Sequence, residues 1–201
     1  MINFNVSRML HVISTVFVIL CWPVYLALFF GRTGPGTERQ RQDSTSRLGI
    51  LLQAASVGVT WAAARPVFTP LSVPFPLSIM APPMAAILAA GAVWFSRTAL
   101  RFLGRQWSLV AGLTADHRLI KDGPYAVVRH PLYTCFFALT FATAIVWSRP
   151  TAIPVIIVLF WAGVWIRVRS EEKILRSAFG VEFDEYVRDV GAFFPRLRHL
   201  L

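Results

Sequence analysis

Charged residues are scarce in this sequence. They make up 15% of the 201 residues, whereas hydrophobic residues make up 56%, and the mean hydropathy is +0.58. So few charges cannot cover the surface of a small soluble domain, and so high an apolar content excludes an intrinsically disordered chain. The composition therefore predicts an integral membrane protein.

Cysteine is also scarce, since only Cys21 and Cys135 are present and both lie inside apolar runs. Two cysteines provide neither a disulfide framework nor a four-cysteine zinc site, and we predict no metal. The net charge is +10, but the Lys and Arg residues separate apolar runs instead of forming a continuous basic face. We therefore expect no nucleic-acid partner.

Long apolar stretches take up much of the chain. A helix needs about 20 mostly apolar residues to cross a bilayer. We identify five candidate stretches, at 10–30, 48–64, 77–96, 132–147 and 151–168. The sequence therefore predicts an all-α integral membrane protein with five transmembrane helices and the lipid bilayer as its surroundings.

The basic residues between these stretches predict the orientation. Seventeen of the 20 Lys and Arg residues fall in 31–47, 97–131 and the tail from 167 onward, and three fall in the other segments. Basic loops are retained in the cytoplasm. We therefore expect the N-terminus outside and a cytoplasmic C-terminal region, with the chemistry where the two large cytoplasmic segments meet.

The fourth and fifth stretches are separated only by Ser148-Arg149-Pro150, so they must form an antiparallel hairpin. The start of one helix and the end of the other then lie at the same membrane boundary. Two groups of polar side chains meet there, Arg129, His130 and Tyr133 from the first helix and Arg167, Glu171 and Glu172 from the second. Ionisable residues at such a depth are candidates for function.

The start of the fourth helix is suited to an anionic ligand. Pro131 fits the first turn, where its missing N–H has no cost, and the free amides of that turn favour a carboxylate. A structural alternative stays open, in which Arg129 anchors the helix at the interface and Tyr133 belongs to an aromatic belt. Likewise, Arg167 and Glu171 could form only a surface ion pair.

Several ordered motifs resemble one known family. They are Gly123-Pro124-Tyr125, Arg129-His130-Pro131-Leu132-Tyr133, Glu171-Glu172 and the run from Phe179 to Tyr186. In this order and spacing they resemble the isoprenylcysteine carboxyl methyltransferase family, integral-membrane enzymes that use S-adenosylmethionine. Phospholipid N-methyltransferases share the paired glutamates. The resemblance covers about 117–195, and 1–96 carries no such signature.

The resemblance implies roles for individual residues. For S-adenosyl-L-methionine it implies His117, Arg118, Leu119, Ile120, Tyr125, His130, Pro131, Leu132, Tyr133 and Glu171. It also implies that Arg129 and Arg167 face the methyl acceptor, and His130 is the nearest candidate for proton transfer. Arg196 is a further candidate for acceptor binding if the tail caps the pocket; alternatively, the tail anchors to anionic lipid.

We therefore predict a three-span membrane region at 1–96 and a catalytic region at 97–201. The function predicted is methyl transfer from S-adenosylmethionine to a lipophilic or small acceptor, resembling protein-S-isoprenylcysteine carboxyl O-methyltransferase. Alternatives are a phospholipid N-methyltransferase and a small-thiol S-methyltransferase. A non-catalytic membrane scaffold or a transporter subunit is a further alternative, although the apolar stretches contain few polar residues near their centres.

Overall fold

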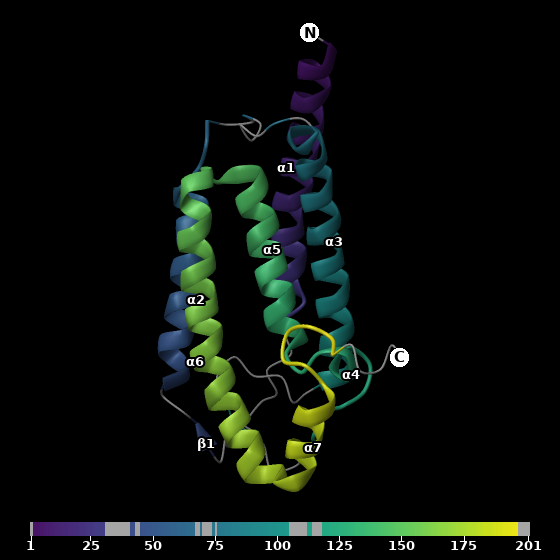
Figure 1. The fold of residues 1–201 in the computed structure, drawn as a ribbon, viewed down its shortest axis with the longest axis vertical. Helices are drawn as coiled ribbons and strands as arrows, with labels where there is room; N and C mark the ends of the chain where they lie inside the picture. The colour runs from purple at the N-terminus through teal and green to yellow at the C-terminus, as the bar shows by residue number, and fades with distance from the viewer. Residues whose placement is uncertain are drawn as a thin grey trace.

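The described residues form a bundle of five long helices that run alternately in opposite directions (Figure 1). The computed structural model describes residues 2–30, 41–42, 45–66, 69, 74, 76–104, 112–113 and 118–196. The long helices are α1 (Ile2–Ala27), α2 (Thr45–Ala62), α3 (Leu77–Leu103), α5 (Pro131–Trp147) and α6 (Ile153–Phe179). The shorter elements are helices α4 (Pro124–Val127) and α7 (Val181–Asp189), a 3-10 turn at Pro150–Ala152, and the antiparallel two-residue strands β1 (Arg41–Gln42) and β2 (Gly112–Leu113).

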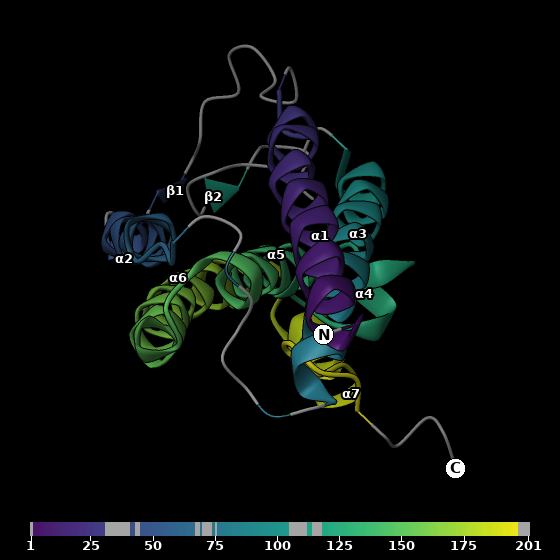
Figure 2. The same cartoon turned by 90° about the horizontal axis from the view of Figure 1, so that it is seen from above.

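Helix α5 lies at the centre of the bundle. Seen from above, α1 and α3 lie on one side of it, and α6 with α2 lies on the other (Figure 2). On the α3 side, small side chains allow close packing, because Ala85, Ala89 and Ala92 are buried in the same core as Leu139 and Val146 of α5. Burial of this apolar surface positions the start of α5, where the predicted polar cluster begins.

The predicted apolar stretches all form helices, but α3 and α6 continue past the predicted ends at 96 and 168. Both continue to a glycine with positive φ, Gly104 at 58° and Gly180 at 51°. Glycine adopts this conformation without steric cost and therefore commonly ends a helix. Hydropathy located the apolar parts, whereas the glycines determine where the helices end.

In the part of the chain that the structure describes, three helical segments are long and apolar enough to cross a membrane: Asn5–Ala27, Leu77–Leu103 and Pro150–Phe179. Helix α5 is apolar but has 17 residues. Helix α2 is less apolar because Gln53, Ser56 and Thr60 are buried on it, and Ser56 donates a hydrogen bond to the Ile156 carbonyl of α6 at 2.8 Å. The protein is thus an integral membrane protein, and five spans with an outside N-terminus stay a prediction.

Helices α2 and α6 approach very closely at Gly49 and Gly163. A Cβ placed on Gly163 would lie 2.6 Å from the Gly49 carbonyl oxygen, and one on Gly49 would lie 2.7 Å from the Gly163 carbonyl oxygen. Such distances are sterically impossible, so only glycine permits this crossing. The same Gly49 lies against the stem of Arg167, whose Cγ would be 2.5 Å from a Cβ there.

Candidate functional site

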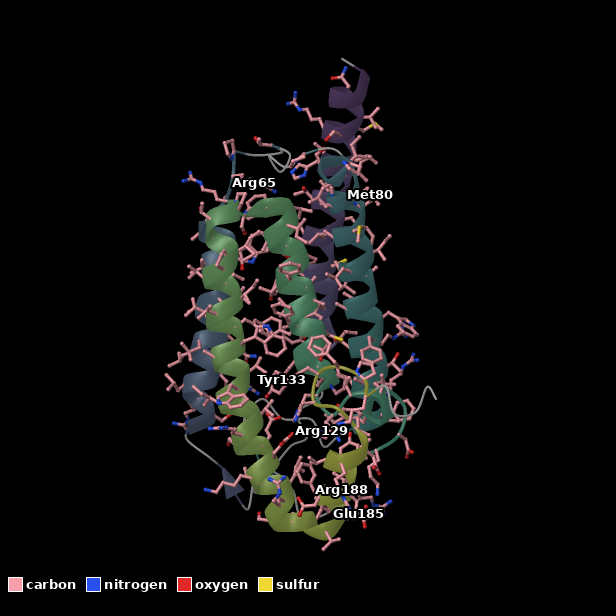
Figure 3. The ribbon with its side chains drawn as sticks, in the orientation of Figure 1. Arg65, Met80, Arg129, Tyr133, Glu185 and Arg188 are labelled. Atoms are coloured by element: carbon pink, nitrogen blue, oxygen red, sulfur yellow. The ribbon has the colours of Figure 1, made fainter. Side chains whose placement is uncertain are left out.

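The α5–α6 hairpin is fixed at its turn by hydrogen bonds to the end of α2. The Arg149 amide donates to the Ala63 carbonyl at 2.8 Å, and the Ser148 hydroxyl donates to the Thr60 carbonyl at 2.7 Å. From this turn the two helices run to the opposite end of the molecule, where Figure 3 places Tyr133 and Arg129. The polar residues predicted to converge there do so.

Glu171 of α6 forms one part of the cluster. The Tyr133 hydroxyl donates a hydrogen bond to Glu171 Oε1, and Arg167 Nε donates to the same hydroxyl at 2.6 Å. Arg167 Nη2 lies 3.6 Å from Glu171 Oε1, and its guanidinium carbon lies 5.1 Å from the centre of the Tyr133 ring. Arg167 is only 6% exposed, so the predicted Arg167–Glu171 pair is not a surface ion pair.

Glu172 forms the second part and takes different partners. Its Oε1 accepts hydrogen bonds from Arg129 Nε at 3.1 Å and Nη2 at 2.8 Å. His130 Nε2 lies 3.0 Å from the same oxygen. The two adjacent carboxylates therefore hold different residues near the start of α5, Tyr133 and Arg129. They share His130, whose Nδ1 is 3.7 Å from Glu171 Oε2.

The segment after α7 encloses Arg129 and His130. Their backbone amides donate to the carbonyls of Gly191 at 2.8 Å and Ala192 at 3.0 Å. The Arg129 Nη1 also donates to the Val190 carbonyl and, at 3.4 Å, to the Val187 carbonyl. With Nε and Nη2 on Glu172, all three guanidinium nitrogens of Arg129 have protein partners.

Aromatic rings fill the space between α5 and α6 next to this cluster. Phe193 lies 5.8 Å from the His130 ring and 4.8 Å from the Trp161 ring of α6, measured between centroids. Trp161 in turn lies 5.1 Å from Phe137 of α5. Phe193 thus packs the C-terminal segment against the His130 ring of the polar cluster and against α6; whether the tail caps a binding pocket stays a prediction.

Helices α4 and α7 are hydrogen-bonded to each other beside the polar cluster, and we call this pair of helices the outer wall of the site. The Tyr186 hydroxyl of α7 donates to the Tyr125 carbonyl of α4 at 2.6 Å. Burial raises the pKa of both tyrosines, so both hydroxyls stay protonated and able to donate. Gly123 has a φ of 60° and lies against the Phe102 ring at the end of α3, which leaves no room for a side chain.

The other predicted site residues are placed as follows. His117 lies outside the described residues. Arg118 is exposed, Leu119 and Ile120 are half-buried, and Pro131 is buried as the first residue of α5, followed by half-buried Leu132. Arg196 is exposed and donates to the Arg188 carbonyl. Within the described part of the chain, no three His, Cys, Asp or Glu residues are grouped as a metal site would require.

Sequence reasoning missed three features of this site. Gly49 under Arg167, and Trp161 and Phe193 between the helices, were not among the candidate residues. A glycine on each of two apolar helices is a signal for close helix crossing. The two aromatic residues carry no such signal, because aromatic residues occur throughout the apolar stretches.

The helices and this cluster define a class: an integral membrane protein with two carboxylates, two buried arginines and aromatic rings at one end of a helical hairpin. Such a site offers hydrogen-bond acceptors to a cationic ligand, guanidinium groups to a carboxylate and ring faces to a delocalised or positive group.

Comparison with known proteins finds a family that part of this chain resembles. Residues 84–177 match the Isoprenylcysteine carboxyl methyltransferase (ICMT) family. Protein-S-isoprenylcysteine O-methyltransferase of Saccharomyces cerevisiae is 36% identical over 81 residues, which cover 40% of this chain and 34% of the relative. The resemblance to the ICMT family is therefore confirmed over α5 and nearly all of α6.

Two bacterial relatives have names of another kind. Cobalt-zinc-cadmium resistance protein CzcN of Cupriavidus metallidurans is 36% identical over 100 residues, or 49% of this chain and 45% of the relative. Nickel-cobalt-cadmium resistance protein NccN of Alcaligenes xylosoxydans xylosoxydans is 32% identical over 114 residues, or 56% and 52%. The chain thus spans about a third to a half of the length of these curated relatives.

Proposed function

We propose that this protein is a multi-pass membrane methyltransferase that transfers a methyl group from S-adenosylmethionine to a lipophilic acceptor bearing a carboxylate. The single observation that carries the proposal is the paired-carboxylate cluster, in which Glu171 holds Tyr133, Glu172 holds Arg129, and His130 lies against both. This cluster lies within 84–177, the segment that matches the ICMT family.

The residues present suit the proposed cofactor. S-adenosylmethionine has an ammonium group and ribose hydroxyls, which need acceptors, and a carboxylate, which needs donors. The Glu171 side chain is 24% exposed and the Glu172 side chain 17%, and Glu172 already accepts three close contacts on one oxygen. Glu171 is therefore the carboxylate with more capacity to hold the cofactor.

We assign Arg129 a positioning role. Its guanidinium is bound on all three nitrogens by Glu172 and by backbone carbonyls of the segment after α7. It is also only 8% exposed. An arginine used in this way holds His130 and the C-terminal segment in place, and the acceptor would meet Arg167 instead.

Arg167 is suited to bind the acceptor carboxylate. Its stem lies against Gly49, and its Nε is held by the Tyr133 hydroxyl at 2.6 Å. A guanidinium that is fixed in place loses little entropy when it binds a carboxylate through its planar fork. The aromatic rings of Trp161 and Phe193 then offer an apolar surface to the rest of a lipophilic acceptor.

The chemistry makes limited demands on the protein. When bound, S-adenosylmethionine supplies an electrophilic methyl group on a positively charged sulfur. A carboxylate acceptor is already ionised at neutral pH, so it needs orientation and a water-poor site instead of a strong base. Arg167 supplies the orientation, and Tyr133 presents a ring face that stabilises positive charge. For an amine or thiol acceptor, His130 is the group placed to take a proton.

We place the site on the cytoplasmic side. The described end of the bundle that contains Glu171 also contains α4, α7 and most of the basic residues, and basic segments are retained in the cytoplasm. The cofactor would enter from the cytoplasm, and the acceptor would enter from the bilayer.

Cofactor binding to Glu171→Ala tests the site. Binding of S-adenosylmethionine to purified protein is measured by calorimetry in detergent, for the original protein, Glu171→Ala and the control Glu185→Ala. Glu185 is an exposed α7 residue paired with Arg188. We expect at least about tenfold weaker binding for Glu171→Ala, the loss typical of a charged hydrogen bond, and unchanged binding for Glu185→Ala. Equal affinities for all three proteins would show that the site is wrong.

The acceptor is tested by transfer of a labelled methyl group. A prenylcysteine analogue with a free carboxylate, phosphatidylethanolamine and a small alkyl thiol are offered separately to the same preparation. We expect label in the prenylcysteine ester, and we expect Arg167→Gln to raise KM for that acceptor more than for S-adenosylmethionine. Label confined to the amine lipid or to the thiol would replace the proposed acceptor by one of those classes.

A further inference from the structure

A second polar group lies at the opposite end of the bundle. Figure 3 shows Arg65 at that end, far along the helices from Arg129. Arg65 follows α2, and its backbone amide donates to the Trp147 carbonyl at 2.9 Å. Its Nη2 donates to the Ile145 carbonyl in the last turn of α5 at 2.7 Å. The arginine is thus held in one position by the ends of two helices.

Three other nitrogens at this end of the bundle are buried without hydrogen-bond partners. Arg65 Nε and Nη1 are inaccessible to solvent and make no hydrogen bond, and the same is true of His11 Nδ1. His11 of α1 is 1% exposed. Buried polar atoms are nearly always paired, so the two unpaired guanidinium nitrogens and the unpaired ring nitrogen indicate a missing hydrogen-bond partner.

Among the described residues, no acidic side chain is paired with Arg65 Nε or Nη1. All ten Asp and Glu residues lie in 38–43, 116–122 and 171–189. The described segments at this end, which are the first half of α1, residues 63–66 after α2 and the α5–α6 turn, contain Arg8, Arg65 and Arg149 and no acid. A buried guanidinium without a counter-charge is costly, and burial lowers the pKa of Arg65 accordingly.

We propose that Arg65 and His11 form a binding site for a phosphate group at the end of the bundle opposite the paired carboxylates. Phosphate has several acceptor oxygens in a geometry that matches the guanidinium fork, so it can satisfy Nε and Nη1 together while His11 donates to another oxygen. The phosphate can belong to a lipid headgroup or be free in solution. We favour a lipid headgroup as the source of the phosphate, because Arg65 directly follows the end of a helix in a membrane protein.

This site does not depend on methyl transfer and is tested by binding and stability. The original protein, Arg65→Met and the control Arg149→Met are purified in detergent and depleted of lipid. Arg149 lies at the same end but is exposed. Thermal unfolding is followed with phosphatidylglycerol, with phosphatidylcholine and with inorganic phosphate against chloride at equal ionic strength. Native mass spectrometry counts the retained phospholipid.

We expect a phosphate-bearing additive to raise the Tm of the original protein and of Arg149→Met but not that of Arg65→Met. The apparent affinity of Arg65→Met for that additive should be at least about tenfold lower. Without any phosphate, Arg65→Met should be at least as stable as the original protein, because it removes an unpaired buried charge. Arg65→Lys should bind more weakly than the original protein because it keeps the charge and loses the fork. His11→Phe should weaken binding by less than Arg65→Met.

The separate additives identify the source of the phosphate. Stabilisation by phosphatidylglycerol alone supports a lipid headgroup, and stabilisation by inorganic phosphate supports a soluble anion. If the original protein and Arg65→Met respond equally to every additive and retain the same number of phospholipids, the proposed site is wrong. S-adenosylmethionine binding, measured on the same samples, should be the same in all three proteins, so failure here is distinct from failure at Glu171.

Discussion

Helix α6 packs against its two neighbours in opposite ways. Toward α2, Gly49 and Gly163 bring the two backbones together so closely that a single methyl group would not fit. Toward α5, the rings of Phe137 and Trp161 stand between the helices, with centroids 5.1 Å apart. One face of α6 is therefore fixed by backbone contact, and the other is separated from its neighbour by side chains.

This difference explains where a site can form. Backbone contact with α2 fixes the height and rotation of α6, and Gly49 directly supports the stem of Arg167. On the α5 face, rings and ion pairs occupy the space between the helices, and side chains can move aside for a ligand whereas backbones cannot. The α2-facing side of α6, which we call the tight face, fixes the position of Arg167. The α5-facing side, which we call the wide face, is where we propose that the acceptor binds.

The largest expected loss of stability comes from removing the buried Arg129–Glu172 ion pair on the wide face. Glu172→Ala leaves the Arg129 guanidinium, which is 8% exposed, without its carboxylate. Removing one partner of a buried pair typically costs about 3–5 kcal/mol of unfolding free energy. Chemical denaturation in detergent, followed by tryptophan fluorescence, measures this loss.

The control for this change is an exposed ion pair. Lys121 and Glu182 are 2.7 Å apart with both side chains about half exposed, so Glu182→Ala should leave stability unchanged within error. The double variant Arg129→Leu/Glu172→Leu should recover much of the loss, because it removes both charges together. A double variant as unstable as Glu172→Ala would contradict the assignment of this pair as buried and mutually dependent.

The next largest loss of stability comes from adding a side chain at the Gly49–Gly163 contact of the tight face. Gly163→Ala places a methyl group 2.6 Å from the Gly49 carbonyl oxygen, so α2 and α6 must separate. We expect a loss of about 1–3 kcal/mol, the range for overpacking. Gly58→Ala, on α2 with open space around it, is the matched control and should be neutral or slightly stabilising, because alanine favours a helix over glycine. Equal stability of the two variants would contradict the close crossing.

Much of the wide face could be predicted from the sequence, and little of the tight face could. The three-residue turn requires α5 and α6 to be neighbours, and Pro131 marks the start of α5, so Tyr133 and Glu171 had to meet. No short connection links α2 to α6, because they are far apart in the chain. Their contact depends on two glycines matching in three dimensions, which the order of helices alone does not reveal. The return of Gly191 to Arg129 is equally non-local.

A smaller loss of stability is expected from removing an aromatic ring on the wide face, and this change also tests whether the acceptor binds there. Trp161→Leu removes the ring contacts with Phe193 and Phe137. Each aromatic pair contributes about 0.5–1.5 kcal/mol, so stability should fall by less than for Glu172→Ala. If this space receives the acceptor, KM for a lipophilic acceptor should rise while the affinity for S-adenosylmethionine stays the same. Equal changes in both constants would place Trp161 outside the acceptor surface.

The smallest expected effect is at the outer wall, at a single hydrogen bond. Tyr186→Phe removes the donor to the Tyr125 carbonyl and should cost about 1 kcal/mol. Burial raises the pKa of Tyr186 in the folded protein, so its contribution is complete below about pH 10, the ordinary tyrosine value, and is lost as the pH rises above it. The stability of the original protein should therefore approach that of Tyr186→Phe at high pH. A constant difference across that range would mean that the hydroxyl is not buried, and that α7 is held by apolar contacts of Phe183 instead.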